Sequence, residues 1–215
     1  MTAFPLILSA PSGGGKTTIA RELLRRRSDF GYSVSCTTRS PREGERHGTD
    51  YTFLSRDEFL AARSRGEFAE SAEVHGELYG TLRREVDGIL ASGKHVVMDI
   101  DVQGTLQFAA AYPDAVLVFL LPPDTSVLLS RLRGRGTETD EAVLRRLRSA
   151  LREVQSAGLY HYVVINDDLE RAVTAVSGIV DAESARTGRS ASLSARIRDL
   201  VAGIEREIEM IERRQ

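Results

Sequence analysis

Eight residues near the N-terminus match the pattern of a phosphate-binding loop. They read Ala10-Pro11-Ser12-Gly13-Gly14-Gly15-Lys16-Thr17. The pattern is G-x-x-x-x-G-K-[ST], and Ala10 stands where its first glycine would be. Glycines let backbone N–H groups converge on phosphate oxygens, and a following helix adds its positive end. We expect Lys16 to reach the β- and γ-phosphates and the Thr17 hydroxyl to ligate Mg²⁺, rather than a turn that binds nothing.

Two aspartates follow a short apolar segment in the middle of the chain. Asp99 and Asp101 stand at the end of His95–Ile100, which we predict to be a buried strand. Because strand side chains alternate, both carboxylates lie on one face. Beside a phosphate loop they would suit Mg²⁺ and its water shell. The alternative is an ordinary acidic turn at a strand end.

The elements that must position these residues alternate between strand and helix. The loop lies between a predicted strand, Phe4–Ser9, and a predicted helix, Lys16–Arg27. Beyond residue 81 we predict, in order, helix Leu82–Leu90, strand His95–Ile100, helix Val102–Ala111, strand Ala115–Leu121, a helix from Asp124 to Leu132, helix Glu141–Ala157, strand Tyr162–Ile165 and helix Leu169–Val180. Such alternation implies an α/β fold of three layers with a mainly parallel central sheet, whose ligands bind at the carboxyl ends of the strands.

The alternation is interrupted between Gly31 and Gly80. Here we predict short strands at Tyr32–Cys36, Tyr51–Leu54 and Phe68–Ala72, and a short helix that begins at a capping box, Ser55 to Glu58. This stretch therefore reads as an inserted small α+β subdomain.

The C-terminal part has a different pattern. Ala185–Ser192 is a small, polar linker, and apolar residues then recur at helical spacing: Leu193, Ile197, Leu200, Ile204, Ile208 and Ile211. This predicts an amphipathic helix with a narrow apolar seam. The seam either packs on the core or pairs with another subunit as a homo-oligomer.

Composition excludes several classes of protein. The 215 residues carry a net charge of −2, whereas a general nucleic-acid binder would be clearly basic. Cys36 is the one cysteine, so no intramolecular disulfide forms, and the four histidines are not spaced for zinc. The longest apolar run, Ala115–Leu121, is too short to cross a bilayer, and no basic region precedes the first apolar segment as in a secretion signal. We expect a cytoplasmic protein with no nucleic-acid or membrane partner.

With these motifs in place, residues 4–182 resemble guanylate kinase. The matching segments are Ser9–Thr18, Phe30–Phe53, Gly66–Thr81, Met98–Gly104, Gly134–Thr139 and Ile165–Asp168. The resemblance implies the reaction ATP + GMP → ADP + GDP with Mg²⁺, and weaker use of dGMP. It also implies a catalytic domain over residues 1–183, with a core (1–34, 82–125 and 146–183), a GMP-binding insert (35–81) and a lid (126–145), followed by the linker and helix of residues 184–215.

The resemblance also implies the residues that bind GMP. They are Ser35, Arg39, Arg42, Tyr51, Glu70, Tyr79, Thr81 and Asp101. The two arginines offer forked donors to a monophosphate, and the tyrosines add hydroxyl donors. Glu70 would read the base, because guanine alone among the common bases sets an N1–H beside an N2 amino group and one carboxylate accepts from both. Without the resemblance, a solvated acid is the alternative for Glu70. Ser35 and Thr81 could donate to the guanine carbonyl, and Asp101 could accept from the amino group.

The ATP side and the lid follow from the same resemblance. It implies ATP contacts from Ala10 to Thr18 and from Arg131, Arg135 and Asn166, whose side-chain carbonyl could accept from the adenine amino group. An asparagine that caps a helix is the alternative for Asn166. Lys16, Arg39, Arg135 and Arg146 would act on the transferring phosphoryl group, and Thr17 with Asp99 would hold Mg²⁺, partly through water.

Two other functions compete with this interpretation. One is a catalytically silent guanylate-kinase-like module that binds proteins, which the presence of Lys16, Thr17 and Asp99 argues against. The other is a P-loop kinase for a different nucleotide, which Glu70 and Asp101 argue against.

Overall fold

The structure is a computed structural model that describes residues 2–74, 76–133, 139–190 and 193–213. It divides into two compact units. One is Ala3–Gly178, and the other comprises Met1–Thr2 and Ile179–Gln215. Each unit is described by itself.

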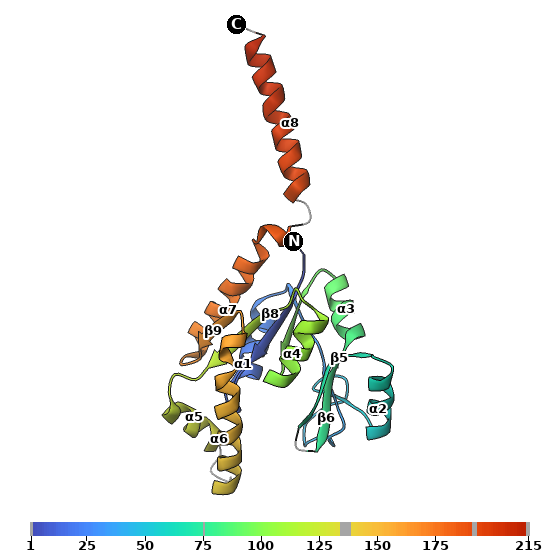
Figure 1. The fold of residues 1–215 in the computed structure, drawn as a ribbon, viewed down its shortest axis with the longest axis vertical. Helices are drawn as coiled ribbons and strands as arrows, with labels where there is room; N and C mark the ends of the chain where they lie inside the picture. The colour runs from blue at the N-terminus through green and yellow to red at the C-terminus, as the bar shows by residue number, and fades with distance from the viewer. Residues whose placement is uncertain (1, 75, 134–138, 191–192, 214–215) are drawn as a thin grey trace. The chain divides into compact units, whose positions relative to one another are not determined.

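A five-stranded parallel sheet forms the centre of the larger unit (Figure 1). Its order is β2-β7-β1-β8-β9, with bounds β1 Pro5–Ser9, β2 Phe30–Tyr32, β7 His95–Asp99, β8 Val116–Leu121 and β9 Tyr162–Ile165. Leu8 of β1 pairs with Asp99 of β7, so the loop after β1 and the acidic segment after β7 leave the sheet side by side. The predicted α/β fold with a mainly parallel sheet is confirmed.

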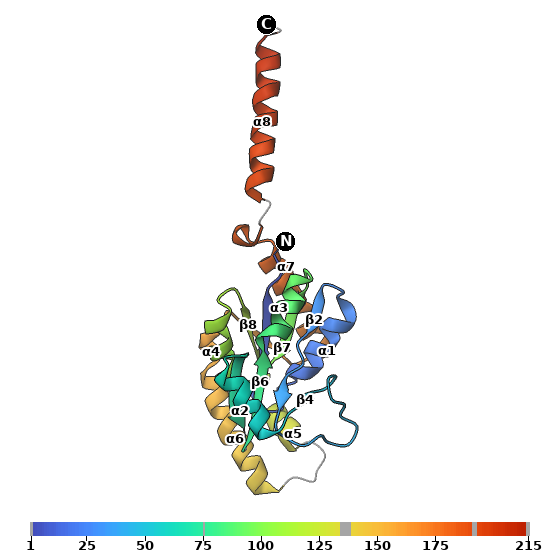
Figure 2. The ribbon, with the colours of Figure 1, turned by 90° about the vertical axis from the view of Figure 1, so that its right-hand side faces the viewer.

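Helices lie on both faces of this sheet (Figure 2). They are α1 Lys16–Arg26, α3 Arg83–Ala91, α4 Val102–Ala111, α5 Thr125–Arg133, α6 Asp140–Gln155 and α7 Leu169–Ser184. Between the strands and helices α3 and α4 lies an apolar core that includes Ile7, Val96, Met98, Phe108 and Leu117, whereas α5 and α6 pack on each other. This rigid layer holds the carboxyl ends of β1 and β7 in fixed positions.

The predicted insertion forms a second sheet of its own. Its order is β4-β3-β6-β5, with β3 Cys36–Thr37, β4 Thr52–Phe53, β5 Phe68–Val74 and β6 Glu77–Leu82, and helix α2 Arg56–Ser64 packs on it. Phe59 of α2 stacks on Phe68 with ring centroids 4.3 Å apart. The predicted capping box is confirmed, because Ser55 and Glu58 exchange both of its hydrogen bonds.

One predicted strand is wrong, and one observed strand was not predicted. The stretch Tyr32–Cys36 is not one strand: Tyr32 pairs with Val97 in the central sheet, whereas Cys36 pairs with Gly80 in the second sheet. The chain crosses from one sheet to the other between these residues. Strand β6 is absent from the prediction, because Gly80 weakens its local strand signal. A Cβ at Gly80 would lie 2.9 Å from the Glu70 carbonyl oxygen, so close packing explains the glycine.

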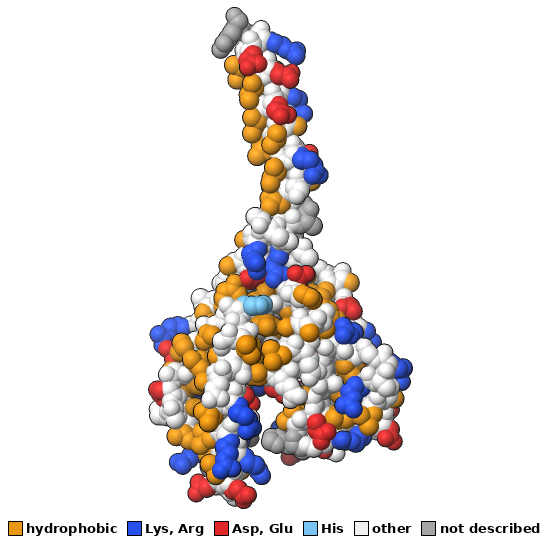
Figure 3. All heavy atoms as spheres, in the orientation of Figure 1, with side chains coloured by type: hydrophobic (Ala, Val, Ile, Leu, Met, Phe, Trp, Pro, Cys, Tyr) orange, Lys and Arg blue, Asp and Glu red, His pale blue; other side chains and the backbone are white. Residues whose placement is uncertain are grey.

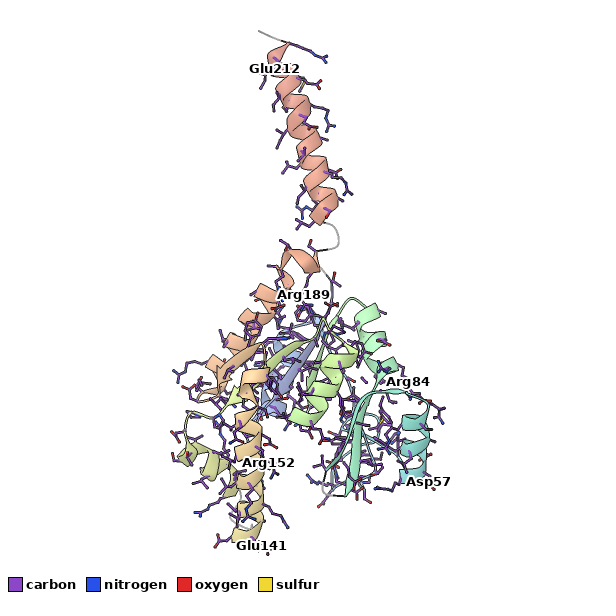
Figure 4. The ribbon with its side chains drawn as sticks, in the orientation of Figure 1. Asp57, Arg84, Glu141, Arg152, Arg189 and Glu212 are labelled. Carbon is purple, nitrogen blue, oxygen red and sulfur yellow. The ribbon has the colours of Figure 1, made fainter. Side chains whose placement is uncertain are left out.

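The smaller unit carries the C-terminal helix, α8 Leu193–Glu212. Before it, a short turn at Thr187–Arg189 is tied to the end of α7 by a buried carboxylate: Glu183 accepts from Arg186 and Arg189, each at 3.1 Å (Figure 4). Helix α7 therefore runs past its predicted end at Val180 to Ser184. Of the helices that the structure describes, none is long and apolar enough to cross a membrane.

Candidate active site

The glycine-rich loop has the backbone that a phosphate site needs. Gly13 and Gly15 adopt left-handed conformations, with φ values of 79° and 86°, which glycine reaches without strain. Gly15 is also the N-cap of α1, and no side chain caps that helix. The first N–H groups of α1 therefore remain available to an anion, as the sequence predicts.

Ala10 and Gly14 are fitted to each other in this loop. Ala10 is buried, and a Cβ added at Gly14 would lie 2.5 Å from the Ala10 Cβ and 2.8 Å from the Pro11 carbonyl oxygen. The Gly14 N–H donates to that same oxygen at 2.7 Å. The methyl group at position 10 is thus accommodated because position 14 has none.

A set of oxygen ligands lies where β1 and β7 end. The Thr17 hydroxyl donates to Asp99 Oδ2 at 2.5 Å, and the Tyr32 hydroxyl donates to Asp99 Oδ1 at 2.9 Å. Hydroxyl and carboxylate oxygens suit a hard cation such as Mg²⁺. In the described ranges no three His, Cys, Asp or Glu side chains are placed to hold a metal ion together, so such an ion would complete its shell with phosphate oxygens and water.

A small cavity of about 150 Å³ lies between the second sheet and the end of β7. Its polar wall includes five residues predicted from the sequence: Ser35, Tyr51, Glu70, Tyr79 and Asp101. Glu70 is 6% exposed, and its Oε1 accepts a hydrogen bond of 2.7 Å from Thr81. The Thr81 proton is therefore engaged by Glu70 in this structure, which makes Thr81 a support for that carboxylate.

The Glu70 side chain is closely confined. A Cβ at Gly104 would lie 2.8 Å from Glu70 Oε2, so the first turn of α4 can approach the carboxylate only as glycine. Burial raises the pKa of Glu70 to about 7, and the nearby Asp101 charge adds to the shift, while the Thr81 hydrogen bond opposes it. Asp101 caps α4 by accepting from the Gly104 N–H at 2.7 Å.

Two predicted arginines, Arg39 and Arg42, are held by an acid that the sequence analysis missed. Arg39 Nη2 donates to both carboxylate oxygens of Glu45, at 2.9 and 3.0 Å. The same carboxylate accepts from the Arg42 backbone N–H at 2.8 Å, and the Arg39 guanidinium lies 5.5 Å from the Tyr51 ring centroid. Glu45 thereby holds the turn that carries both arginines.

A larger cleft of about 780 Å³ connects the phosphate loop with the second sheet. Its lining includes Ala10, Lys16, Arg42, Arg146 and Asp101. Figure 3 shows this side hollowed between two lobes, with basic side chains along the lobe that carries α6. Asp101 and Val74 line both this cleft and the smaller cavity. A ligand in the cavity would therefore lie next to a ligand on the loop.

Helix α6 is hydrogen-bonded to the phosphate loop at Ser12. Arg146 Nε donates to the Ser12 hydroxyl at 3.1 Å, and the Ser12 N–H donates to Glu153 at 3.0 Å. Arg146 also donates to the Leu132 carbonyl at the end of α5, at 2.9 Å. The predicted lid-side arginine thus links three elements around the cleft, and Glu153, which the sequence analysis missed, adds a second contact.

A third cavity, of about 300 Å³, lies on the other side of the loop and includes Gly13, Thr18, Arg131 and Asn166. Asn166 Nδ2 donates to the Gly14 carbonyl at 2.7 Å, and Arg131 Nη2 donates to the Asn166 carbonyl at 2.9 Å. Arg131 Nη1 is buried, and nothing in the described part of the chain accepts from it. The capping alternative for Asn166 is wrong, because Asp168 accepts from the Arg171 N–H and caps α7.

The structure brings together nearly all the predicted residues, and Arg135 lies outside the residues that it describes. Three supporting residues escaped the sequence analysis: Tyr32, Glu45 and Glu153. Only Glu45 carries a local signal, as an acid between arginines in one turn. Tyr32 and Glu153 act across 67 and 141 positions of sequence, which no local pattern reveals.

Comparison with known proteins gives a consistent result. The family model described as guanylate kinase matches residues 2–183. The guanylate kinase of Anaeromyxobacter dehalogenans is 51% identical over 183 residues, which cover 84% of this chain and 81% of that protein. The guanylate kinase of Geobacter sulfurreducens is 44% identical and covers 85% and 90%.

A solved structure agrees with these sequences. The crystal structure of guanylate kinase from Anaplasma phagocytophilum superposes with a TM-score of 0.74 at 34% identity, covering 90% of this chain and 93% of that one. The glycine loop, the carboxylate pocket beside it and these relatives all point one way: the chain belongs to the guanylate kinase family.

Proposed function

We propose that this enzyme transfers the γ-phosphoryl group of ATP to GMP, and that the residues gathered around the two adjoining cavities perform the transfer. The observation that carries the proposal is the shared wall of the cavities. Asp101 and Val74 border both the pocket of Glu70 and the cleft of Lys16. A base held against Glu70 would project its phosphate toward the loop that grips ATP.

Recognition of guanine rests on the ionised carboxylate of Glu70. It accepts from N1–H and from the N2 amino group, a pair of donors that adenine cannot present. The Thr81 hydrogen bond at 2.7 Å and the close approach of Gly104 fix the carboxylate. Because these polar groups are buried, a wrong base leaves them unpaired, and such sites discriminate by about 10⁴–10⁵.

The donor is held by the backbone of the loop and by Lys16. The left-handed glycines turn N–H groups toward the phosphates, and the uncapped start of α1 adds favourable potential. Thr17 and Asp99 would supply oxygen ligands to Mg²⁺, and Tyr32 fixes the Asp99 carboxylate. Bound there, Mg²⁺ would neutralise charge on the β- and γ-phosphates.

The transfer itself needs no general base. A phosphate monoester has a second pKa of about 6 and is largely dianionic at pH 7. An oxygen of the GMP phosphate attacks the γ-phosphorus, the bond from that phosphorus to the bridging oxygen breaks, and ADP leaves with the electron pair. Arg39 and Arg42 position the acceptor phosphate, while Lys16, Arg146 and the predicted Arg135 stabilise the spread charge.

We also propose that the enzyme is divided into core, insert and lid, uses dGMP more weakly than GMP, takes Mg²⁺ as its metal and is cytoplasmic. Closure of the lid over both nucleotides would exclude the water that otherwise hydrolyses ATP.

A coupled assay of ADP release tests the proposal. GMP, AMP, CMP, UMP and dGMP are compared as acceptors under identical conditions. We expect GMP to be used well ahead of the others, with dGMP next. Equal rates with GMP and AMP would remove the role assigned to Glu70, and ADP release that no acceptor stimulates would remove phosphoryl transfer.

A further inference from the structure

Helix α8 carries an exposed apolar seam that has no part in the proposed phosphoryl transfer. It lies beyond residues 2–183, which match the family. None of its described residues is buried. Six of its large apolar side chains are 47–66% exposed: Ile197, Leu200, Val201, Ile204, Ile208 and Ile211. A stripe of apolar side chains along α8 is visible in Figure 3, and Figure 4 shows its side chains up to Glu212. In proteins most of the stability of a helix comes from packing of its apolar face, so this exposed seam calls for a partner surface.

The spacing of the seam suits contact along a straight helix. Leu193 and Ile204, Ile197 and Ile208, and Leu200 and Ile211 are each eleven positions apart. A repeat of eleven residues corresponds to about 3.67 residues per turn, close to the 3.6 of an ideal helix. The seam therefore stays on one side for the whole length of α8, and a second straight helix can follow it.

The charged side chains that flank the seam change sign along α8. On one flank Arg196 comes first and Glu207 follows eleven residues later. On the other flank Arg198 comes first, and Glu205 and Glu212 follow at intervals of seven. Both flanks are thus basic in the N-terminal half of α8 and acidic in the C-terminal half.

This arrangement decides the direction of pairing. In an antiparallel pair each flank meets the same flank of its partner in reverse, so Arg196 faces Glu207 and Arg198 faces Glu205 of the second copy. In the same arrangement Leu200 packs beside Ile204 and Leu193 beside Ile211 of the second copy. A parallel pair would instead place Glu207 opposite Glu212, which repel each other.

We propose that α8 is a dimerisation element that pairs with α8 of a second copy of this chain in antiparallel orientation. The partner is identified by the match of seam to seam and of basic halves to acidic halves. This pairing is independent of the proposed phosphoryl transfer, so either one can be contradicted while the other holds.

Sedimentation of the full chain over a dilution series tests the pairing. We expect the wild-type chain to sediment with twice the mass of one chain. The double variant Leu200→Asp with Ile204→Asp should raise the dissociation constant of the dimer at least about 100-fold, because each copy loses two apolar side chains that the dimer would bury. The matched control, Ala195→Asp with Arg206→Asp, places the same residues on the opposite face and should leave the dimer intact. A wild-type chain that sediments as a monomer, as it would if the seam packed on its own core, overturns the proposal.

Disulfide trapping tests the direction. Leu193→Cys and Ile211→Cys are made separately in a Cys36→Ala background, and each is oxidised alone and mixed with the other. An antiparallel pair predicts cross-linking mainly in the mixture, because these two positions meet across the seam. Efficient cross-linking of each variant with itself, and no gain in the mixture, would show a parallel pair and overturn the antiparallel assignment.

Discussion

The donor and acceptor halves of the active site are built by different means. The donor half is a contiguous run, Gly13–Gly15 and the start of α1, whose backbone groups we propose as the phosphate contacts. The acceptor half collects side chains from separate strands, and Glu70 depends on Thr81 and Gly104 for its position. Phosphates are common to all nucleotides, whereas the base distinguishes them. We therefore assign phosphate binding to the local backbone, and specificity for the base to side chains that long-range contacts hold in place.

Removal of the loop lysine should have the largest effect, because it disables the donor half for every acceptor. We expect Lys16→Ala to lower kcat by at least about 10³-fold, as the loss of a charge that stabilises the transferring group predicts. Its circular dichroism should match the wild type. Lys94→Ala, at the other and exposed lysine, is the control and should retain full turnover. Near-normal turnover by Lys16→Ala would contradict the role of the loop.

A change at Glu70 should instead affect the acceptor half alone. Glu70→Gln keeps the size of the side chain but presents a donor where guanine also donates. We expect kcat/KM for GMP to fall about 10³-fold while the KM for ATP stays within about twofold. Glu73→Gln, at an exposed position of the same strand, should behave as the wild type. An equal loss for GMP in both variants would show that the effect is not one of base recognition.

The pH profile should separate the same two halves. Because the pKa of Glu70 is raised to about 7, kcat/KM for GMP should fall about tenfold per unit below pH 7 and level off above it. The GMP phosphate also titrates near pH 6, so the Glu70→Gln profile serves as the reference. A profile unchanged by Glu70→Gln would contradict the assignment.

The free energy of unfolding should fall as pH rises, whereas kcat/KM for GMP should rise. The folded protein holds the Glu70 proton up to about pH 7 and the unfolded chain releases it near pH 4.5, so stability is lost as pH rises through this window. At pH 8, Glu70→Gln should therefore raise the unfolding free energy, by up to about 3 kcal/mol. Urea denaturation at pH 5 and pH 8 measures the difference, which should nearly vanish at the lower pH.

The smallest effect should come from packing within the loop. Gly14→Ala places a methyl group against Ala10 and should destabilise the fold by about 1–3 kcal/mol. Ala10→Gly alone should cost less than about 1 kcal/mol. In the double variant part of the loss should be recovered, because only the Pro11 contact at 2.8 Å remains. Strictly additive effects in thermal unfolding would contradict the fit of these two positions.

Sequence patterns predict the fold well where the signal is local. The strands β1, β7, β8 and β9 contain apolar runs between helices, and their positions follow from that pattern, although β9 is only partly buried. The break after Tyr32 was not predictable in this way, because partners distant in the sequence decide it. Strand β6, which forms a hairpin with β5, was missed because Gly80 weakens its local strand signal.

The site shows the same division. The loop from Ala10 to Thr17 was readable from spacing alone, whereas Glu70 needed the resemblance to a family to distinguish it from a solvated acid. The support that Glu70 receives from Thr81, and the contacts of Tyr32 and Glu153, depend on packing that spans the whole unit. Local spacing predicts phosphate binding, whereas the choice of substrate rests on residues that only the tertiary structure brings together.

A crystal structure with GMP and ADP bound would test the account most directly. It predicts both oxygens of the Glu70 carboxylate within hydrogen-bond distance of guanine N1 and N2, with the GMP phosphate turned toward Lys16 across the shared wall at Asp101. A carboxylate turned away from the edge of the base would contradict it.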